Sequence, residues 1–176
     1  MPTIPGGQRG LKQVTFSGST KVQLEAAWAL TNIVSGTTEQ TLVVLNSGML
    51  APMIQLLGSS DLEVAEQAVW AIGNIIGDCA DFRDRVMNQG ALPYFVNLAN
   101  RSLPIGFLRT FTWAFSNICR HRNPPVDLEV VRTVLPIISF LVHHQDSAEN
   151  LYTFCCGQME RGQTSFSEAQ ILIMLE

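Results

Sequence analysis

Apolar residues recur at helical spacing along most of the chain, and the pattern is clearest in three segments that share a hexapeptide. The copies read WALTNI at 28–33, WAIGNI at 70–75 and WAFSNI at 113–118, so the tryptophans lie 42 and 43 residues apart. Repeat periods in the low forties are typical of helical solenoids, in which stacked units bury a continuous core. The chain of 176 residues has room for about four such units.

The rest of each period repeats as well and predicts three helices per unit. NSGMLAPMIQLL at 46–57 matches NQGALPYFVNLA at 88–99, and RTVLPIISFL at 132–141 is a third version without the glycine. The first helix of a unit should end near Gly48 or Gly90, because glycine is favoured just past a helix end. Asp61 is placed to cap a third helix. The expected ranges are 39–45 and 81–87 for the short first helices, 50–57 and 92–99 for the middle helices, and 21–35, 62–76 and 105–120 for the long third helices. No segment alternates as a strand does, so the predicted fold is all-α.

The tryptophan of each third helix falls on the polar face. At about 100° per residue, the apolar residues gather on the side turned away from it. The predicted core stripes are Val22, Ala26, Ala27, Ala29, Leu30, Ile33 and Val34; Val64, Ala65, Ala68, Val69, Ala71, Ile72, Ile75 and Ile76; and Phe107, Leu108, Phe111, Ala114, Phe115, Ile118 and Cys119. The opposite faces carry Trp28 with Thr31 and Asn32, Trp70 with Glu66, Gln67, Gly73 and Asn74, and Trp113 with Thr110, Ser116 and Asn117. The sequence therefore predicts a ladder of exposed Trp–Asn pairs, one pair per unit.

Two interpretations of this ladder stay open. A recurring tryptophan more often belongs to a core, but a core residue should lie on the apolar stripe, and none of the three does. An exposed aromatic series usually marks a binding surface. The alternative is partial burial of each tryptophan between repeats, since solenoid helices contact neighbours on both sides.

The chemistry of the ladder predicts an extended peptide rich in lysine and arginine. Slots between parallel indoles suit the aliphatic stems of these side chains, and cation–π attraction adds roughly 0.5–2 kcal/mol per contact. An asparagine offers both a donor and an acceptor for a peptide backbone. Asp78, Glu25 and Glu66 would supply a negative field, whereas Arg109 and Arg120 oppose cations on the third unit. The first two units should therefore bind such a peptide best.

Composition narrows the classes of function. A net charge of −4 argues against nucleic acid as the main partner. No apolar run suggests a signal peptide or a membrane span. Cys79, Cys119, Cys155 and Cys156 lack zinc-ligand spacing and are expected to be reduced thiols. His143 and His144 precede Asp146, but no nucleophile–base spacing or phosphate loop accompanies them. We predict no enzyme, no metal and no cofactor.

The repeated segments are specific enough to indicate a family: residues 16–146 resemble the armadillo core of the importin-α (karyopherin-α) family. The matching runs are LEAAWALTNIVSGTTEQT at 24–41, EVAEQAVWAIGNIIGD at 63–78 and FTWAFSNICRHRNP at 111–124. The resemblance implies an armadillo-type right-handed superhelical solenoid, with about three units plus partial ends. It also implies a nuclear import adaptor, found in cytoplasm and nucleus, whose groove binds nuclear localisation signals.

The resemblance assigns peptide binding residue by residue. The ladder residues are Trp28, Asn32, Trp70, Asn74, Trp113 and Asn117, and Asp78 is assigned the contact with a signal lysine. Further groove positions are Ser35, Gly36, Thr41 and Gln67, and Arg120 matches an arginine of the family.

The chain also departs from the family pattern. Thr110 stands where the family usually has asparagine, three residues before the third tryptophan. Residues 1–15 carry only Arg9 and Lys12, which argues against importin-β binding, and we expect this segment to be disordered. The period places the next Trp–Asn pair at Cys155 and Met159, and the tail 147–176 matches nothing in the family.

A solenoid cut in this way should be marginally stable or should self-associate. Two alternatives to the transport function stay open. One is an armadillo scaffold of the β-catenin kind, and the other is a truncated isoform that no longer transports cargo.

Overall fold

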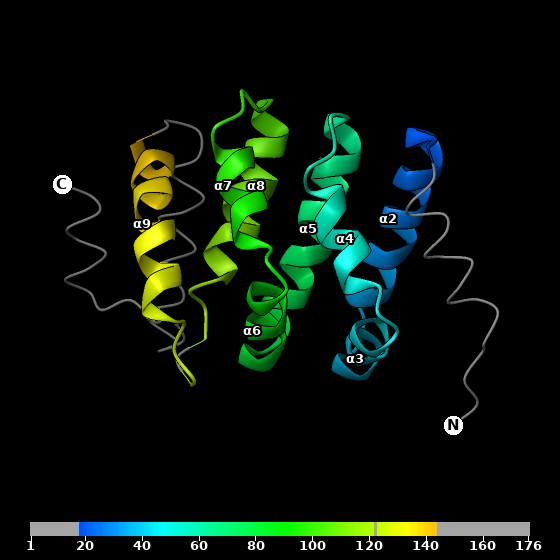
Figure 1. The fold of residues 1–176 in the computed structure, drawn as a ribbon, viewed down its shortest axis with the longest axis horizontal. Coiled ribbons are helices and arrows are strands. Elements are labelled where there is room, and N and C mark those ends of the chain that lie inside the picture. The colour runs from blue at the N-terminus through cyan, green and yellow to red at the C-terminus, as the bar shows by residue number, and fades with distance from the viewer. Residues whose placement is uncertain (1–17, 122, 144–176) are drawn as a thin grey trace.

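The computed structural model describes residues 18–121 and 123–143, and within these ranges it contains eight helices and no strand (Figure 1). The predicted all-α fold is therefore confirmed. The helices are α2 (Thr20–Val34), α3 (Thr38–Asn46), α4 (Leu50–Leu56), α5 (Leu62–Asp78), α6 (Ala80–Asn88), α7 (Leu92–Ala99), α8 (Ile105–Asn117) and α9 (Leu128–His143).

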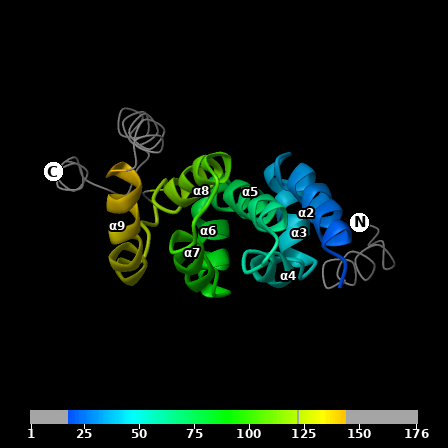
Figure 2. The same ribbon diagram turned by 90° about the horizontal axis from the view of Figure 1, so that it is seen from above.

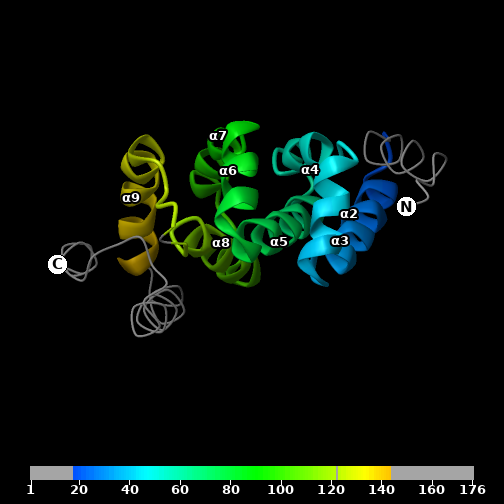
Figure 3. The same ribbon diagram turned by 90° about the horizontal axis from the view of Figure 1, so that it is seen from below.

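The helices are arranged as stacked three-helix units. The long helices α2, α5 and α8 lie side by side along one edge of the stack, and the shorter α3, α4, α6 and α7 lie behind them (Figures 2 and 3). Helix α5 packs against both α2 and α8, and α9 packs against α7 and α8. The third helices thus form one continuous layer, which places the three tryptophans on neighbouring helices.

Interactions within one turn set several of the helix ends. Asp61 caps α5 as predicted, with its Oδ1 accepting hydrogen bonds from the backbone N–H groups of Glu63 (3.0 Å) and Val64 (3.3 Å). Gly48 and Gly90 follow α3 and α6 with φ of 74° and 82°, a conformation that side-chain-bearing residues rarely adopt. Helix α8 ends at Asn117, three residues before its predicted end.

The third period replaces two helices by one. The chain runs as a single helix, α9, over the region where the period predicts a short and a middle helix. Counting 42 or 43 residues on from Gly90 leads to Arg132 or Thr133, both inside α9. Without a glycine, this position favours right-handed helical backbone, so the helix continues through it.

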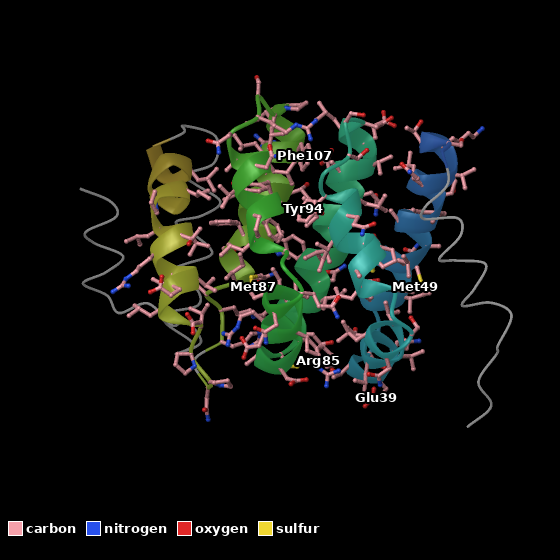
Figure 4. The ribbon with its side chains drawn as sticks, in the orientation of Figure 1. Glu39, Met49, Arg85, Met87, Tyr94 and Phe107 are labelled. Atoms are coloured by element: carbon pink, nitrogen blue, oxygen red, sulfur yellow. The ribbon has the colours of Figure 1, made fainter. Side chains whose placement is uncertain are left out.

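The core follows the predicted stripes and adds an aromatic cluster. Phe95 of α7 packs against Phe111 and Phe115 of α8, with ring centroids 6.0 Å apart in both pairs. Tyr94 of α7 reaches across to the end of α4, where a Cβ added to Gly58 would lie 3.0 Å from the ring (Figure 4). The phenylalanine cluster holds α7 and α8 of one unit together, and the approach of Tyr94 to Gly58 connects that unit to the preceding one, as a solenoid requires.

Two residues of the predicted core stripe are exposed to solvent. Val22 and Ile33 of α2 are 37% and 40% exposed. Helix α2 packs chiefly against α3 and α5, and that packing leaves these two side chains open to solvent. Their assignment from the helical wheel was therefore wrong.

Arg83 of α6 fastens the segment that follows α8. Its side chain is completely buried and donates to the carbonyl oxygens of His121 (3.1 Å) and Pro124 (3.0 Å). Its Nε also pairs with the carboxylate of Asp84 at 2.8 Å. A buried guanidinium needs such partners, because an unpaired buried charge is strongly unfavourable.

The described ranges fall entirely within the predicted repeat region 16–146. The expected disordered segment 1–15 and the divergent tail 147–176 lie outside the described residues. Within the part of the chain that is described, no helix has the length and apolar character needed to cross a membrane.

Candidate functional site

Two of the three tryptophans are exposed on neighbouring helices. Trp28 of α2 is 57% exposed and Trp70 of α5 is 50% exposed. The prediction that they lie on the open face of their helices is confirmed. Trp113 of α8 is only half-buried and packs partly against the core. The interpretation that the tryptophans are exposed therefore holds for Trp28 and Trp70. The alternative, partial burial between repeats, holds for Trp113.

Trp113 rests on a glycine of the preceding unit. A Cβ added to Gly73 of α5 would lie 2.5 Å from Cζ3 of Trp113 and 2.9 Å from the Cβ of Ala114. Real Cβ atoms do not approach this closely, so only glycine lets α8 pack here. The equivalent residue of the first unit is Thr31, and that of the third is Ser116.

The three asparagines differ in burial. Asn32 is exposed, and Asn74 is half-buried with an enclosed Nδ2 that has no hydrogen-bond partner among the described residues. Asn117 is 1% exposed, and its Nδ2 donates to the carbonyl oxygen of Gly73 at 3.1 Å. The expected exposure of Asn117 is therefore wrong, because α8 packs against α5 on that side. Its Oδ1 is buried without a partner in the described part of the chain.

Polar side chains bridge the third helices beside the tryptophans. Gln67 of α5 donates from Nε2 to the hydroxyl of Thr31 on α2 at 2.7 Å. Thr110 of α8 donates from its hydroxyl to Oε1 of Glu66 on α5 at 3.1 Å. These hydrogen bonds link each third helix to the next one.

Asp78, the last residue of α5, is held by the first turn of α3. The Thr38 hydroxyl donates to Asp78 Oδ1 at 2.8 Å. This contact joins the first and third helices of one unit and fixes the carboxylate at the end of the Trp70 helix. Three ion pairs occur among the described residues, and none involves Asp78 or Glu66.

The remaining predicted positions divide into surface and interior. Ser35 and Gly36 are exposed just past α2, and the Ser35 hydroxyl donates to the Asn32 carbonyl oxygen at 3.0 Å. Thr41 is completely buried, with its hydroxyl 3.4 Å from the Thr37 carbonyl oxygen, so it supports the start of α3 and presents no surface to a ligand. Arg120 is half-buried at the end of the α8 segment.

The pKa of His121 is lowered from its ordinary value. Burial is the main cause, and the positive charges of Arg120 and Arg83 add to it. The His121 imidazole is therefore neutral at physiological pH. In the described ranges no group of three or more His, Cys, Asp or Glu side chains is placed to hold a metal ion.

Three further residues shape this face: the sequence placed Thr31 and Gly73 on the tryptophan side without giving them a role, and Thr38 was not predicted. Thr38 holds Asp78, Thr31 receives the hydrogen bond from Gln67, and Gly73 accommodates Trp113. The sequence contains a pattern that could have identified Thr31 and Gly73. The residue three positions after each tryptophan is small in all three copies, which is what close packing of the next third helix requires.

Comparisons with known proteins agree with this architecture. The armadillo/beta-catenin-like repeat family matches residues 37–77. Importin subunit alpha-3 of Caenorhabditis elegans is 50% identical over 137 residues, which cover 78% of this chain and 27% of that protein. Importin subunit alpha-8 of Mus musculus is 54% identical over 127 residues, which cover 72% of this chain and 26% of that protein.

Solved structures with the same fold include designed proteins. Computationally designed armadillo repeat proteins for modular peptide recognition superpose with a TM-score of 0.73 at 21% identity, covering 94% of this chain and 68% of the designed one. A designed armadillo repeat protein in complex with the peptide (KR)4 gives a TM-score of 0.62 at 23% identity, covering 97% and 82%.

Stacked three-helix units with a continuous layer of third helices define an armadillo-repeat protein. The repeats of this chain belong to the importin-α family of such proteins. The chain spans about a quarter of the length of the curated relatives it matches.

Proposed function

We propose that the face formed by α2, α5 and α8 binds extended Lys/Arg-rich peptides, namely the nuclear localisation signals of imported proteins. The observation that carries the proposal is the pair Trp28 and Trp70, two large aromatic side chains at equivalent positions of consecutive units, each at least half exposed. Exposure of this kind has no stabilising role in the fold and usually marks a binding surface.

The contacts available on this face suit a basic peptide. An indole face attracts a cation by roughly 0.5–2 kcal/mol. Asn74, one turn beyond Trp70, has an Nδ2 without a hydrogen-bond partner in the described part of the chain, so it can donate to a peptide carbonyl oxygen, a bond worth about 0.5–1.5 kcal/mol. In this proposal, hydrogen bonds from the asparagines hold the peptide backbone extended. The slots between the indole rings select lysine and arginine side chains.

Charge favours the first two units over the third. Asp78 and Glu66 are carboxylates without a cationic partner among the described residues. The third unit instead carries Arg109, which is exposed, and Arg120. A basic peptide is therefore bound between Trp28 and Trp70 more tightly than beside Trp113.

Relatives support the transport role. The relatives named above are importin subunits alpha, and a designed protein of the same fold was solved with the peptide (KR)4. In this proposal the chain acts as an adaptor rather than an enzyme and works in both cytoplasm and nucleus. Recruitment of importin-β is a separate step, and residues 1–15 offer only two basic side chains for it.

Fluorescence anisotropy of a labelled lysine-rich localisation peptide, titrated with the full chain, tests the proposal. Saturable binding is expected. The double variant Trp70→Ala, Asn74→Ala should weaken it about tenfold or more, because it removes one cation–π contact and one hydrogen bond. Leu128→Ala is the matched control, since Leu128 is an exposed apolar residue on α9, away from the ladder.

The outcomes separate the competing functions. If the folded chain does not bind the basic peptide but binds an acidic one, the interaction-scaffold alternative is correct and the import proposal fails. Basic-peptide binding without importin-β recruitment in a pull-down would indicate a chain that binds cargo but does not transport it.

A further inference from the structure

A cavity of about 490 Å³ lies between α6 and the start of α9. On the α6 side it is lined by residues that include Met87 (Figure 4), and on the other side by the segment that leads into α9. None of its lining residues belongs to the third helices α2, α5 and α8, and α6 lies behind that layer (Figures 2 and 3). The volume falls within the range of small-ligand sites, about 300–1,000 Å³. The cavity is therefore a candidate site separate from the tryptophan ladder.

The floor of this cavity is apolar. Val126 is 7% exposed and belongs to the hydrophobic core. Met87 and Val130 are half-buried and pack against the same core. Helix α9 packs against α7 and α8, and between its first turn and α6 the apolar surface stays accessible. Such a floor favours a ligand with a hydrocarbon portion, because covering it removes apolar area from water.

Two carboxylates line the cavity from opposite sides. Asp84 lies on α6, and Asp127 immediately precedes α9. Asp84 Oδ1 pairs with Arg83 Nε at 2.8 Å, and Asp127 Oδ1 accepts a hydrogen bond from the backbone N–H of Glu129 at 2.8 Å. Within the described ranges, neither Oδ2 has a hydrogen-bond or ion-pair partner. The fold thus orients both carboxylates and leaves each of them one acceptor oxygen for a ligand.

The protein neutralises only one of these two charges. Asp127 is exposed and takes part in none of the three ion pairs of the described residues. Arg83 pairs with Asp84, but it is completely buried and directs its Nη groups to the carbonyl oxygens of His121 and Pro124. The cavity therefore combines an apolar floor with an excess of negative charge, which is complementary to a cation that carries a hydrocarbon stem.

We propose that this cavity binds an arginine side chain of a partner protein that docks behind the ladder. The hydrocarbon stem lies on the apolar floor, and the guanidinium donates to Asp84 and Asp127. Arginine suits the site better than lysine, because its planar guanidinium carries five donors and can serve two acceptors at once, whereas an ammonium is one compact charge. The partner leaves the tryptophans free, so its binding and that of a groove peptide are compatible.

An NMR titration of the full chain, isotopically labelled at the methionine methyl groups, tests the proposal. Met87 reports on the cavity, and its signal is assigned with the variant Met87→Leu. The probe is N-acetyl-arginine N-methylamide, which presents the side chain on an uncharged backbone. Two matched probes carry lysine or norleucine in place of arginine. Comparing the three probes on the wild type does not depend on the folding of any variant.

The arginine probe should shift the Met87 signal saturably and bind about two- to fivefold more tightly than the lysine probe, and more tightly still than the norleucine probe. Asp127→Asn should weaken the arginine probe about two- to fivefold and reduce its salt dependence, while asparagine keeps an acceptor for the Glu129 N–H. Glu63→Gln, at an exposed position of α5, is the control for net charge and should bind as the wild type does.

Other results overturn the inference in distinguishable ways. If no probe shifts the Met87 signal, the cavity does not accept such a side chain. If the norleucine probe binds as tightly as the arginine probe, the carboxylates do not contribute. Equal binding of lysine and arginine would show that any cation suffices and that the arginine assignment is wrong. If Asp127→Asn binds the arginine probe like the wild type, the guanidinium does not contact that carboxylate.

Discussion

Gly73 allows the second and third units to pack, and replacing it should disturb the seam beneath Trp113. In Gly73→Ala the new Cβ would lie 2.5 Å from Cζ3 of Trp113 and 2.9 Å from the Cβ of Ala114. Carbon atoms in ordinary contact are about 3.5–4.0 Å apart, so the overlap is about 1 Å. The Ala114 Cβ is attached directly to the backbone and can retreat only if α8 moves.

The expected loss of stability follows from two opposing terms. Overpacking a tight interface costs typically 1–3 kcal/mol. Alanine in place of a helical glycine contributes roughly 0.5–1 kcal/mol in the other direction. Gly73→Ala should therefore lower the free energy of unfolding by about 1 kcal/mol. The Trp113 side chain should also become more exposed.

Urea unfolding followed by tryptophan fluorescence measures this change. Gly106→Ala is the matched control, because Gly106 is also a helical glycine, in α8, and a Cβ added there would meet no atom within 4 Å. It should leave stability unchanged or raise it. If Gly73→Ala is as stable as the wild type or more stable, the close approach of α8 to Gly73 is not a constraint on this fold.

Three further changes test other parts of the fold. Arg83→Met should lower the free energy of unfolding by about 2–4 kcal/mol, because it removes a fully buried guanidinium that donates to the carbonyl oxygens of His121 and Pro124. Arg85→Met, at an exposed position, should change it by about 0.5 kcal/mol or less. Asp61→Ala should cost about 1 kcal/mol through loss of the α5 cap. Because the pKa of His121 is lowered in the fold, the unfolded chain binds more protons below about pH 6.5. Stability should therefore fall as pH drops through that value, and His121→Asn should reduce the fall.

All three are measured by urea unfolding, the last at pH 7.5 and 5.5. Equal effects of the two arginine substitutions would show that the buried hydrogen bonds contribute little. An unchanged stability of Asp61→Ala would mean that water replaces the cap without loss. If His121→Asn loses as much stability on acidification as the wild type, another group is responsible for the pH dependence.

The sequence alone determined the helical elements and their order. Gly48, Gly90 and Asp61 set helix ends through interactions within one turn. These ends can be predicted from the sequence because they depend only on residues that are neighbours along the chain. The 42- and 43-residue spacing likewise predicted stacked units, and the helical wheel correctly placed Trp28 and Trp70 on open faces.

The tertiary structure decided which polar-face residues remain accessible. Thr31, Gly73 and Asn117 lie on the tryptophan side of their helices, yet all three are buried, while Val22 and Ile33 of the apolar stripe are exposed. A helical wheel describes one helix in isolation. Burial also depends on which flank the next helix covers, and that is fixed only when α2, α5 and α8 pack side by side.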